Sequence, residues 1–391
     1  MTIDLTREAD FSDLFAITTP IEHIELLRFD CLVPRHFSFG SWHNRQHGVL
    51  RLSSGGHSGL AEDMLSANQP DMVLAEKGEV FRALDGMTIG QALRGAYEGT
   101  LTLKDAHREM AEIALLDLAG RLQGKPALEL LGLHTTGHVN GTPSILSDDP
   151  EKVRREARMH RERGYTANLK IKLFGKPALD RTLVSTARAM MAPEAYLSGD
   201  VNSGYGKTAD GVQISELATT LRWLYELGLN GCEDPAEMPV ADWVALQSQV
   251  LPQDLIPDVV LRPARASRLT VVAGMGRKFN IHPGCTGGLL QAIQLGRRIC
   301  ALGAQLVIGD NSLIGPACTF WQQLAIGFGA GWCEAVEKPE DTDDFLRCIT
   351  HRPVTLQDGG RLVLTGLRPG FGLGVDEAAM RGAAKAILVL R

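Results

Sequence analysis

Two lysines, Lys170 and Lys172, lie in a short apolar run that extends from Leu169 to Leu173. Side chains alternate along a β-strand, so residues two apart point to the same face. A Lys-x-Lys strand on its own is usually a solvated sheet edge, but two ammonium groups facing an interior are costly unless acidic groups lie nearby. Such a pair is typical of a site that moves protons.

Three acids follow the lysines at intervals that suit the ends of successive strands: Asp200, Glu233 and Asp258. Carboxylates are the hard oxygen ligands that Mg²⁺ prefers, and Mn²⁺ is also possible. A metal held there would polarise a substrate carboxylate and stabilise the enediolate formed when the α-proton leaves. A lysine next to a second ammonium and a metal has a lowered pKa and can act as a base.

The chain from about residue 140 alternates short apolar runs with helical stretches, which predicts parallel strands joined by helices. The predicted strands are 166–173, 196–201, 231–233, 255–260, 279–282, 305–308 and 331–335. The predicted helices are 150–163, 181–190, 211–227, 240–249, 264–274, 289–302 and 315–325. This number of units favours an α/β fold of the closed (β/α)7-8 barrel type, in which functional side chains lie at the carboxyl ends of strands. Six polar residues fall at or near such ends: Lys170, Lys172, Asp200, Glu233, Asp258 and His282.

The first part of the chain has a different pattern. Strand-like runs at 21–33 and 48–52 are joined by a predicted loop from Phe37 to Asn44, and a helix is predicted over 106–122. The tail from Val354 contains the hairpin-like turn at 357–360 and could return to the first domain. We therefore expect an α+β domain over 1–140, completed by 355–391, and a barrel over 141–354.

Composition excludes several classes of protein. The 391 residues are 44% hydrophobic and 22% charged, as in an ordinary globular protein. A net charge of −6 without a basic stripe argues against nucleic-acid binding. The sequence contains no apolar run of 18 residues, so no membrane span is predicted. Residues 1–10 do not resemble a signal peptide. Seven scattered cysteines without a CxxC pair predict reduced thiols in the cytoplasm.

The motifs together resemble the enolase superfamily, in the branch of muconate lactonizing enzyme and mandelate racemase. The resemblance covers nearly the whole chain and is carried by the segments 114–120, 124–126, 169–172, 200–202, 232–235, 280–284, 287–289 and 311–315. It implies a modified TIM barrel with an N-terminal capping domain, and a homo-oligomer. It also implies that Lys172 is the base, that Lys170 modulates it, and that Asp200, Glu233 and Asp258 bind the metal.

Two features depart from the pattern of this superfamily. Asp258 is followed by Val259-Val260 where the family usually has Glu-Ser, and a shifted register would instead put Leu261 at the ligand position. His282 occupies the place of a lysine, and Asn311 stands where an acid is common. An imidazole titrates near pH 7, so His282 could be a base, an acid or only a hydrogen-bond donor.

Three functions remain open at this point. A Lys172/His282 pair predicts a racemase, epimerase or cycloisomerase acting on a small carboxylate, whereas His282 as an acid would make a hydroxy-acid or acid-sugar dehydratase. The altered third-ligand motif also allows a binding protein without turnover. The predicted substrate contacts are Asn202 and Asn311 in the barrel, and Trp42 and His43 in the predicted loop of the first domain.

Overall fold

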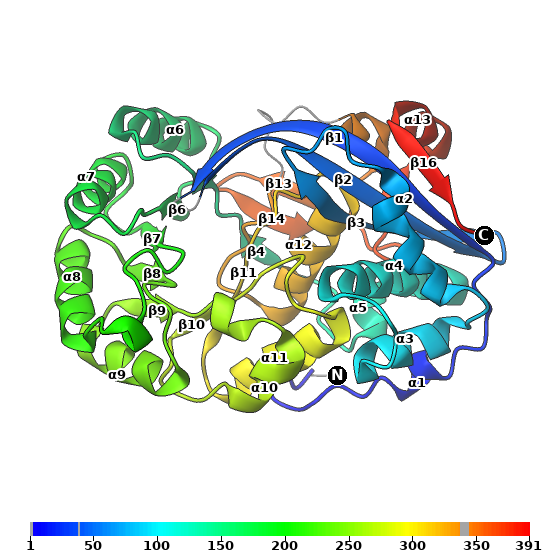
Figure 1. The fold of residues 1–391 in the computed structure, drawn as a ribbon, viewed down its shortest axis with the longest axis horizontal. Helices are drawn as coiled ribbons and strands as arrows, with labels where there is room; N and C mark the ends of the chain where they lie inside the picture. The colour runs from blue at the N-terminus through cyan, green and yellow to red at the C-terminus, as the bar shows by residue number, and fades with distance from the viewer. Residues whose placement is uncertain (1–2, 38–39, 337–343) are drawn as a thin grey trace.

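The computed structural model describes residues 3–37, 40–336 and 344–391. Figure 1 shows an antiparallel sheet (blue, with β16 in red) beside a series of strand–helix units (green to yellow). The sheet and helices α1–α5 are called the cap below, and the strand–helix units are called the barrel.

The cap sheet has the order β16-β1-β2-β3 and is antiparallel throughout. Its strands are β1 (His23–Phe37), β2 (Gly40–Ser54), β3 (His57–Ala67) and β16 (Ala386–Val389). The prediction of a loop from Phe37 to Asn44 is wrong for residue 37 and residues 40–44, which lie in strands. Residues 38–39 lie outside the described residues. β1 and β2 continue pairing as far as Phe37 and Gly40, because a long hairpin satisfies the backbone groups that a loop would leave to water.

The cap helices cover one face of this sheet (Figure 1). They are α1 (Ser12–Phe15), α2 (Leu74–Gly78), α3 (Ile89–Glu98), α4 (Asp105–Gln123) and α5 (Ala127–Leu130), with a 3₁₀ turn at Glu79–Leu84. α4 approaches β3 so closely at Gly59 that a Cβ there would lie 2.1 Å from the Ala114 carbonyl oxygen. The glycine is therefore what allows the predicted helix over 106–122 to pack on the sheet.

The barrel strands form two parallel groups. β5 (Ser144–Ile145), β6 (Asn168–Lys172), β7 (Tyr196–Asp200), β8 (Gly231–Glu233) and β9 (Asp254–Ile256) pair in that order, and β10 (Lys278–Ile281) pairs with β11 (Gln305–Ile308). The helices between them are α6 (Pro150–Glu162), α7 (Pro177–Arg188), α8 (Ile214–Glu226), α9 (Val240–Val250), α10 (Ala264–Thr270), α11 (Leu289–Ala301) and α12 (Pro316–Phe328).

Backbone contacts between the two groups close them into a ring. The Asn280 amide donates to the Pro257 carbonyl at 2.9 Å, which joins β9 to β10. On the other side, Cys333 forms parallel bridges with both Ile308 and Gly141. The expected α/β barrel is confirmed, and segment 331–334 is one of its strands.

The predicted barrel elements agree with the structure in order and type, with several differences. The helix predicted over 181–190 begins earlier, at Pro177, and the strand predicted over 331–335 pairs only through isolated bridges at Cys333. The strand expected over 255–260 ends at Ile256, and a 3₁₀ turn follows at Val259–Leu261. The helix expected over 264–274 ends at Thr270. The barrel strand β5, which pairs with β6, was not predicted. It has only two residues, which is too few to show an alternation of apolar and polar side chains.

The C-terminal tail contacts both parts of the molecule. The predicted hairpin turn joins β13 (Val354–Gln357) to β14 (Arg361–Leu364), and β14 pairs with β4 (His138–Asn140). The remaining elements are β12 (Ile349–His351), β15 (Gly374–Val375), α13 (Glu377–Ala383) and a 3₁₀ turn at Phe345–Cys348. In the described part of the chain, no helix has the length and apolar character needed to cross a membrane.

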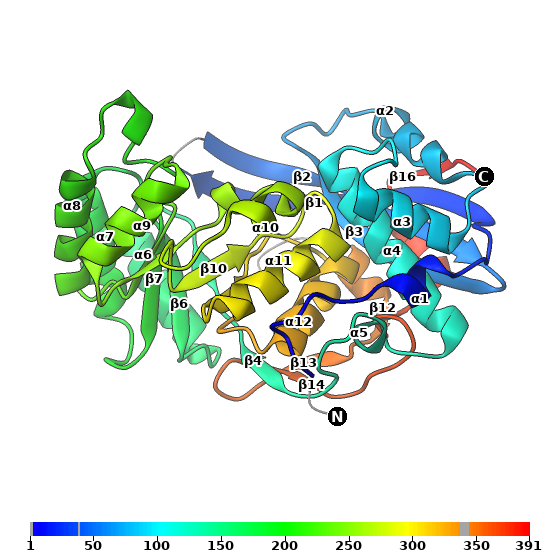
Figure 2. The ribbon, with the colours of Figure 1, turned by 90° about the horizontal axis from the view of Figure 1, so that it is seen from below.

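Buried acids of the cap hold the amino ends of barrel elements. Glu62 on β3 accepts the backbone N–H groups of Gly315 and Ala317 at the start of α12, at 2.8 and 3.3 Å. Glu112 on α4 accepts the N–H of Leu289 at the start of α11. Figure 2 shows α11 and α12 beside the cap helices. These carboxylates satisfy N–H groups that a helix end leaves without an internal partner.

Candidate active site

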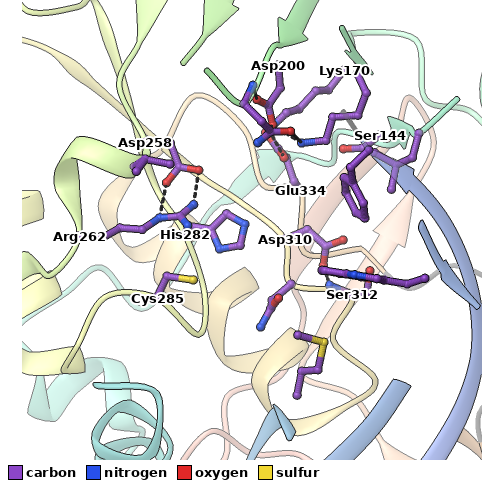
Figure 3. A pocket seen from close by; sticks show the side chains of 18 of the residues that line it. Ser144, Lys170, Asp200, Asp258, Arg262, His282, Cys285, Asp310, Ser312 and Glu334 are labelled. Carbon is purple, nitrogen blue, oxygen red and sulfur yellow. Dashed lines mark hydrogen bonds and ion pairs between the residues drawn. The ribbon is translucent and has the colours of Figure 1, made fainter. Parts of the chain in front are cut away.

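The carboxyl ends of the barrel strands surround a cavity of about 420 Å³ (Figure 3). The cap covers one side of this cavity through β2 and β3, which contribute Trp42, Arg45 and Met64. The predicted site residues that line it are Lys170, Lys172, Asp200, Asn202, Asp258, His282, Asn311 and Trp42. Eight of the ten predicted residues thus meet in one cavity, although they are separated by up to 269 positions in the chain.

Lys170 lies at the centre of a group of buried acids. Its Nζ is 2.7 Å from Glu233 Oε2, 2.8 Å from Glu334 Oε2 and 3.7 Å from Asp200 Oδ2. Burial alone would lower the pKa of this ammonium, but the three carboxylates outweigh it and raise the pKa well above its usual value. Lys170 is therefore a fixed positive charge and not a proton acceptor.

Lys172 points to the same side of β6 as Lys170, as its spacing predicts. Its Nζ contacts the Asp200 carboxylate and donates to Asn202 Oδ1 at 2.8 Å. It also lies 5.4 Å from the centre of the Phe37 ring, which comes from the cap. These contacts hold the Lys172 amine at the edge of the cavity, where it can reach a bound molecule.

Asp200 and Glu233 lie side by side at the ends of β7 and β8. Burial tends to raise the pKa of Asp200, but Lys172 and Lys170 hold it at about 2, so this acid is a carboxylate. Glu233 is fully buried beneath the cavity and accepts from Asn280 Nδ2 at 2.9 Å. Burial raises the pKa of Glu233 well above its usual range, with Lys170 opposing the rise and Asp200 adding to it.

Asp258 lies two residues beyond the end of β9, and its side chain faces the cavity. Both of its oxygens accept hydrogen bonds from the Arg262 guanidinium, with 2.9 Å between Oδ1 and Nε. The carboxylate of Asp234 accepts the backbone N–H groups of Asp258 and Val259 at 3.1 and 3.0 Å. The alternative register is wrong, because Leu261 is buried in the following 3₁₀ turn and is not among the described residues that line the cavity.

His282 follows β10 directly and lines the cavity beside Asp258 and Arg262 (Figure 3). Its Nδ1 lies 2.8 Å from the Pro283 carbonyl oxygen. A carbonyl can only accept, so Nδ1 carries the proton and Nε2 has a free lone pair when the ring is neutral. Burial lowers the pKa of His282 to about 4, although Asp258 opposes the shift. A neutral imidazole at pH 7 can accept a proton but has little capacity to donate one.

The ring order places Lys172 and His282 on opposite sides of the cavity. Among the described residues the ring consists of segment 141–145, the strands β6 to β11, and segment 331–334. β10 is the fourth strand after β6 in this ring of eight, so the side chains at their carboxyl ends face each other across the interior.

Of the two predicted substrate contacts in the cap, only Trp42 lines the cavity. Trp42 packs on Phe37, with 4.8 Å between ring centres, and the Arg45 guanidinium lies 4.4 Å from its ring centre. The prediction for His43 is not supported, because its side chain is exposed and is not among the described residues that line the cavity. β2 continues through this position, and alternation along a strand turns neighbouring side chains to opposite faces.

The two predicted amides have different surroundings. Asn202 adopts a positive φ of 48° in the turn after β7, and its own N–H donates to Asp200 Oδ1 at 2.9 Å. It thus forms the turn and also orients Lys172. Asn311 donates to Asp63 of the cap at 3.2 Å, and its carbonyl oxygen accepts from Arg45 at 2.6 Å. Asn311 therefore connects the barrel to the cap at the edge of the cavity.

The predicted metal site has the right donors in type. Asp200, Glu233 and Asp258 supply carboxylates from three consecutive strands, the chemistry that suits a divalent cation. Among the described residues, however, no three side chains of His, Cys, Asp or Glu converge as a metal site would require. Each predicted acid holds a cationic side chain instead: Lys172 on Asp200, Lys170 on Glu233 and Arg262 on Asp258. Metal binding by these residues therefore stays a prediction.

The structure adds functional candidates that the sequence pattern did not identify. Glu334 is buried on the eighth strand of the ring, lines the cavity and bonds Lys170. The strand was predicted, so the rule that polar residues at strand ends are functional would have found it. Arg262 and Arg45 also line the cavity, but neither lies at a predicted strand end, and only the tertiary structure brings them there.

Comparisons with known proteins agree with this geometry. The family model described as enolase C-terminal domain-like matches residues 152–379, which is more than half of the chain. The chain therefore belongs to the enolase superfamily, in the branch of mandelate racemase and muconate lactonizing enzyme, and the resemblance seen in the sequence is confirmed.

Individual relatives are more distant. N-succinylamino acid racemase of Thermus thermophilus is 29% identical over 203 residues, which is 52% of each chain. The chain spans about half the length of the curated relatives that it matches. Two solved structures share the fold over nearly their whole length. The first is muconate lactonizing enzyme from Pseudomonas fluorescens with muconolactone, which has a TM-score of 0.77 and 20% sequence identity and covers 94% of this chain and 100% of that chain. The second is dipeptide epimerase from Cytophaga hutchinsonii with Mg and D-Ala-L-Val, which has a TM-score of 0.76 and 16% sequence identity and covers 95% of this chain and 100% of that chain.

Proposed function

We propose that this member of the enolase superfamily removes the α-proton of a small carboxylate and returns a proton to the same carbon or to its conjugated system. The reaction type is racemase, epimerase or cycloisomerase. The observation that carries the proposal is that Lys172 and His282 reach one cavity from opposite sides of the barrel. A two-sided pair is what inversion at a carbon requires, because one group must take the proton and the other must supply one.

The two groups suit opposite roles in one direction of reaction. Nε2 of His282 has a free lone pair and accepts the α-proton on its side of the substrate. The Lys172 amine acts as a donor towards Asp200 and Asn202, so it supplies a proton on the other side. These two transfers leave His282 as an imidazolium and Lys172 as a neutral amine, so in the reverse direction Lys172 accepts and His282 donates. Lys170 stays charged and stabilises negative charge that develops on the substrate carboxylate.

We propose Mg²⁺ as the cofactor, held by Asp200, Glu233 and Asp258. When bound, a divalent cation polarises the substrate carboxylate and so makes the α-proton more acidic. The acids suit this role because they are hard oxygen donors on adjacent strand ends. The magnesium in the related dipeptide epimerase supports the choice of metal.

The substrate class follows from the cavity and from the relatives. A volume of about 420 Å³ suits a molecule of the size of an acylated amino acid or a dipeptide. The names of the relatives refer to N-succinylamino acids, Ala-Glu dipeptides and muconolactone, which are all small and acidic. We propose a substrate with a carboxylate next to the acidic C–H, and with a polar group that reaches Trp42 and Arg45 of the cap.

Deuterium exchange tests this function directly. The protein is incubated in D₂O with Mg²⁺ and a panel of N-acyl amino acids, dipeptides and muconolactones, and α-proton loss is followed by ¹H NMR. We expect exchange with at least one class, and we expect Asp200→Asn to abolish it. The control is Asp210→Asn, because Asp210 lies in an exposed 3₁₀ turn after β7 and outside the cavity. An absence of exchange across the whole panel, with the protein folded, would contradict the proposal.

The two alternatives have less support. A dehydratase in which His282 protonates the leaving hydroxyl needs a ring that is already protonated when the substrate binds, whereas the bond from Nδ1 to Pro283 and the lowered pKa favour a neutral ring in that state. A 2-keto acid product, detected with semicarbazide, would show dehydration. A binding protein without turnover would bind a carboxylate ligand and exchange no α-proton of it.

A further inference from the structure

The Asp258 carboxylate is held by an internal cation. Arg262, four residues further along the chain, donates from Nε to Oδ1 at 2.9 Å and from Nη2 to Oδ2. Asp258 is only 2% exposed, whereas the Arg262 side chain is 27% exposed and lines the cavity. Figure 3 shows the paired contacts next to His282. A bidentate contact of this kind occupies both carboxylate oxygens at the same time.

This pair differs from the other two cation–acid contacts of the site. Lys170 and Lys172 are anchored on β6, and each also bonds a group other than its predicted metal ligand, Glu334 and Asn202 respectively. Both described side-chain hydrogen bonds of Arg262 are with Asp258. Arg262 is therefore the cation whose position depends most on this one acid.

The backbone around Asp258 is fixed independently of Arg262. The Asp234 carboxylate binds the N–H groups of Asp258 and Val259, and the Leu261 N–H donates to the Asp258 carbonyl at 2.8 Å. These bonds hold the main chain at Asp258 without any contribution from Arg262, and the Arg262 side chain borders the cavity. A buried carboxylate without a counter-charge is costly, so the departure of Arg262 must be coupled to the arrival of another cation.

We propose that Arg262 is a built-in counter-ion that competes with a divalent metal for Asp258. It neutralises Asp258 when the metal is absent, and it releases both oxygens when the metal binds. The affinity for the metal is then lower than the three carboxylates alone would provide. This inference rests on the proposed function, since it takes Asp258 as a metal ligand.

Metal titration of the full chain tests the competition. Mn²⁺ binding is measured by electron paramagnetic resonance of the free ion, and Mg²⁺ binding by calorimetry, for wild type, Arg262→Gln and Arg262→Lys. We expect Arg262→Gln to bind either metal about tenfold more tightly, because a charge-assisted competitor has been removed. Arg262→Lys should fall between the two, since an ammonium cannot engage both oxygens in the same way.

The matched control is Arg277→Gln. Arg277 forms an ion pair with Asp254 at 3.2 Å, at the other end of the same strand β9 and away from the cavity. Its loss should leave metal affinity unchanged. Thermal unfolding gives a second readout: without metal, Arg262→Gln should melt below wild type, and saturating Mg²⁺ should raise its Tm by more than that of wild type.

The outcomes separate this inference from the proposed function. Unchanged or weaker binding by Arg262→Gln, together with binding by the wild type, would overturn the inference and leave the metal-dependent function intact. Tighter binding by Arg262→Gln that is lost in the Arg262→Gln/Asp258→Asn double variant would support it. If neither wild type nor Arg262→Gln binds metal while both stay folded, the proposed metal-dependent function itself fails.

Discussion

At the scale of single residues, the two proposed proton carriers hold their protons in different ways. His282 keeps Nε2 open because Nδ1 is committed to the Pro283 carbonyl, and burial disfavours a second proton. The hydrogen bonds of Lys172 within the described residues both go to acceptors, the oxygens of Asp200 and Asn202. The pair is therefore asymmetric, and each direction of an inversion depends on a different starting state.

The asymmetry predicts a stereochemical split between two variants. Lys172→Met should still exchange the α-proton of the enantiomer that faces His282, while His282→Asn should still exchange the opposite one. Each variant should lose racemisation by at least about 10²-fold, the usual contribution of a general acid or base. ¹H NMR of separate enantiomers in D₂O measures both quantities. If either variant exchanged both enantiomers at the wild-type rate, the assignment of that residue would be wrong.

At the scale of elements, the cap and the barrel are joined by buried carboxylates that bind backbone N–H groups. Glu109 on α4 accepts from Gly284 at 2.7 Å, from the Thr286 amide at 3.0 Å and from the Thr286 hydroxyl at 2.6 Å. The loop that follows His282 is thus held from the cap. The position of a proposed catalytic side chain therefore depends on a helix about 170 residues earlier in the chain.

Glu109→Gln should loosen this loop. An amide group presents one N–H face to donors, so at least one of the three bonds is lost, at a cost of about 1–3 kcal/mol. We expect a Tm lower by a few degrees and a lower kcat with little change in KM. Differential scanning calorimetry and steady-state kinetics measure these effects. Glu129→Gln is the control, because Glu129 is exposed on α5. Equal Tm and kcat values for Glu109→Gln and wild type would argue against this role.

Glu112 is a second acid of α4 that binds a backbone N–H of the barrel, and its protonation makes the stability of the protein depend on pH. Burial raises its pKa to about 8, even though the Leu289 N–H and Arg108 oppose the shift. A carboxyl whose pKa is higher in the folded state than in the unfolded state binds more protons when folded. Its contribution to stability is therefore complete below about pH 4.5 and is lost as the pH rises towards 8.

The variant Glu112→Gln removes this titration. The Tm of the variant minus that of wild type should increase between pH 5 and pH 9, corresponding to a difference on the order of 3 kcal/mol in unfolding free energy. Thermal melts across this range measure it. A difference that stays constant with pH would show that Glu112 does not titrate in this window.

At the scale of the whole molecule, the C-terminal segment completes the cap sheet. β16 pairs with β1 over Glu25–Arg28, and the Leu390 N–H donates to the Ile24 carbonyl at 2.9 Å. The cap is therefore formed from residues at both ends of the described chain, with the barrel between them. The domain limits at 140/141 and 354/355 stay a prediction.

Deletion of residues 386–391 should destabilise the protein by roughly 3 kcal/mol or more, because it removes a ladder of backbone hydrogen bonds and leaves an edge of β1 unpaired. We expect a lower Tm and faster aggregation, measured by calorimetry and light scattering. The double variant Ile387→Thr/Val389→Thr is the control, because both side chains are exposed and the backbone pairing is retained. A deletion variant as stable as this control would contradict the prediction.

The local pattern of the sequence was sufficient for the barrel and for the residues at its strand ends. Alternation along β6 places Lys170 and Lys172 on one face, and the apolar runs locate Asp200, Glu233 and His282 at strand ends. These features depend on neighbouring residues only, so a single sequence contains them. The same reasoning found neither the two-residue strand β5 nor the continuation of β2 through His43, because pairing with distant strands decides both.

Tertiary structure alone decided which charges meet. The sequence determined that Asp258 is an acid near a strand end, but only the fold places the Arg262 guanidinium across both of its oxygens. Likewise, the three carboxylates that surround Lys170 come from strands up to 164 positions away. Electrostatic interactions act through space and depend on burial, so the ionisation state and the partners of these groups follow from the packed molecule and not from the order of residues in the chain.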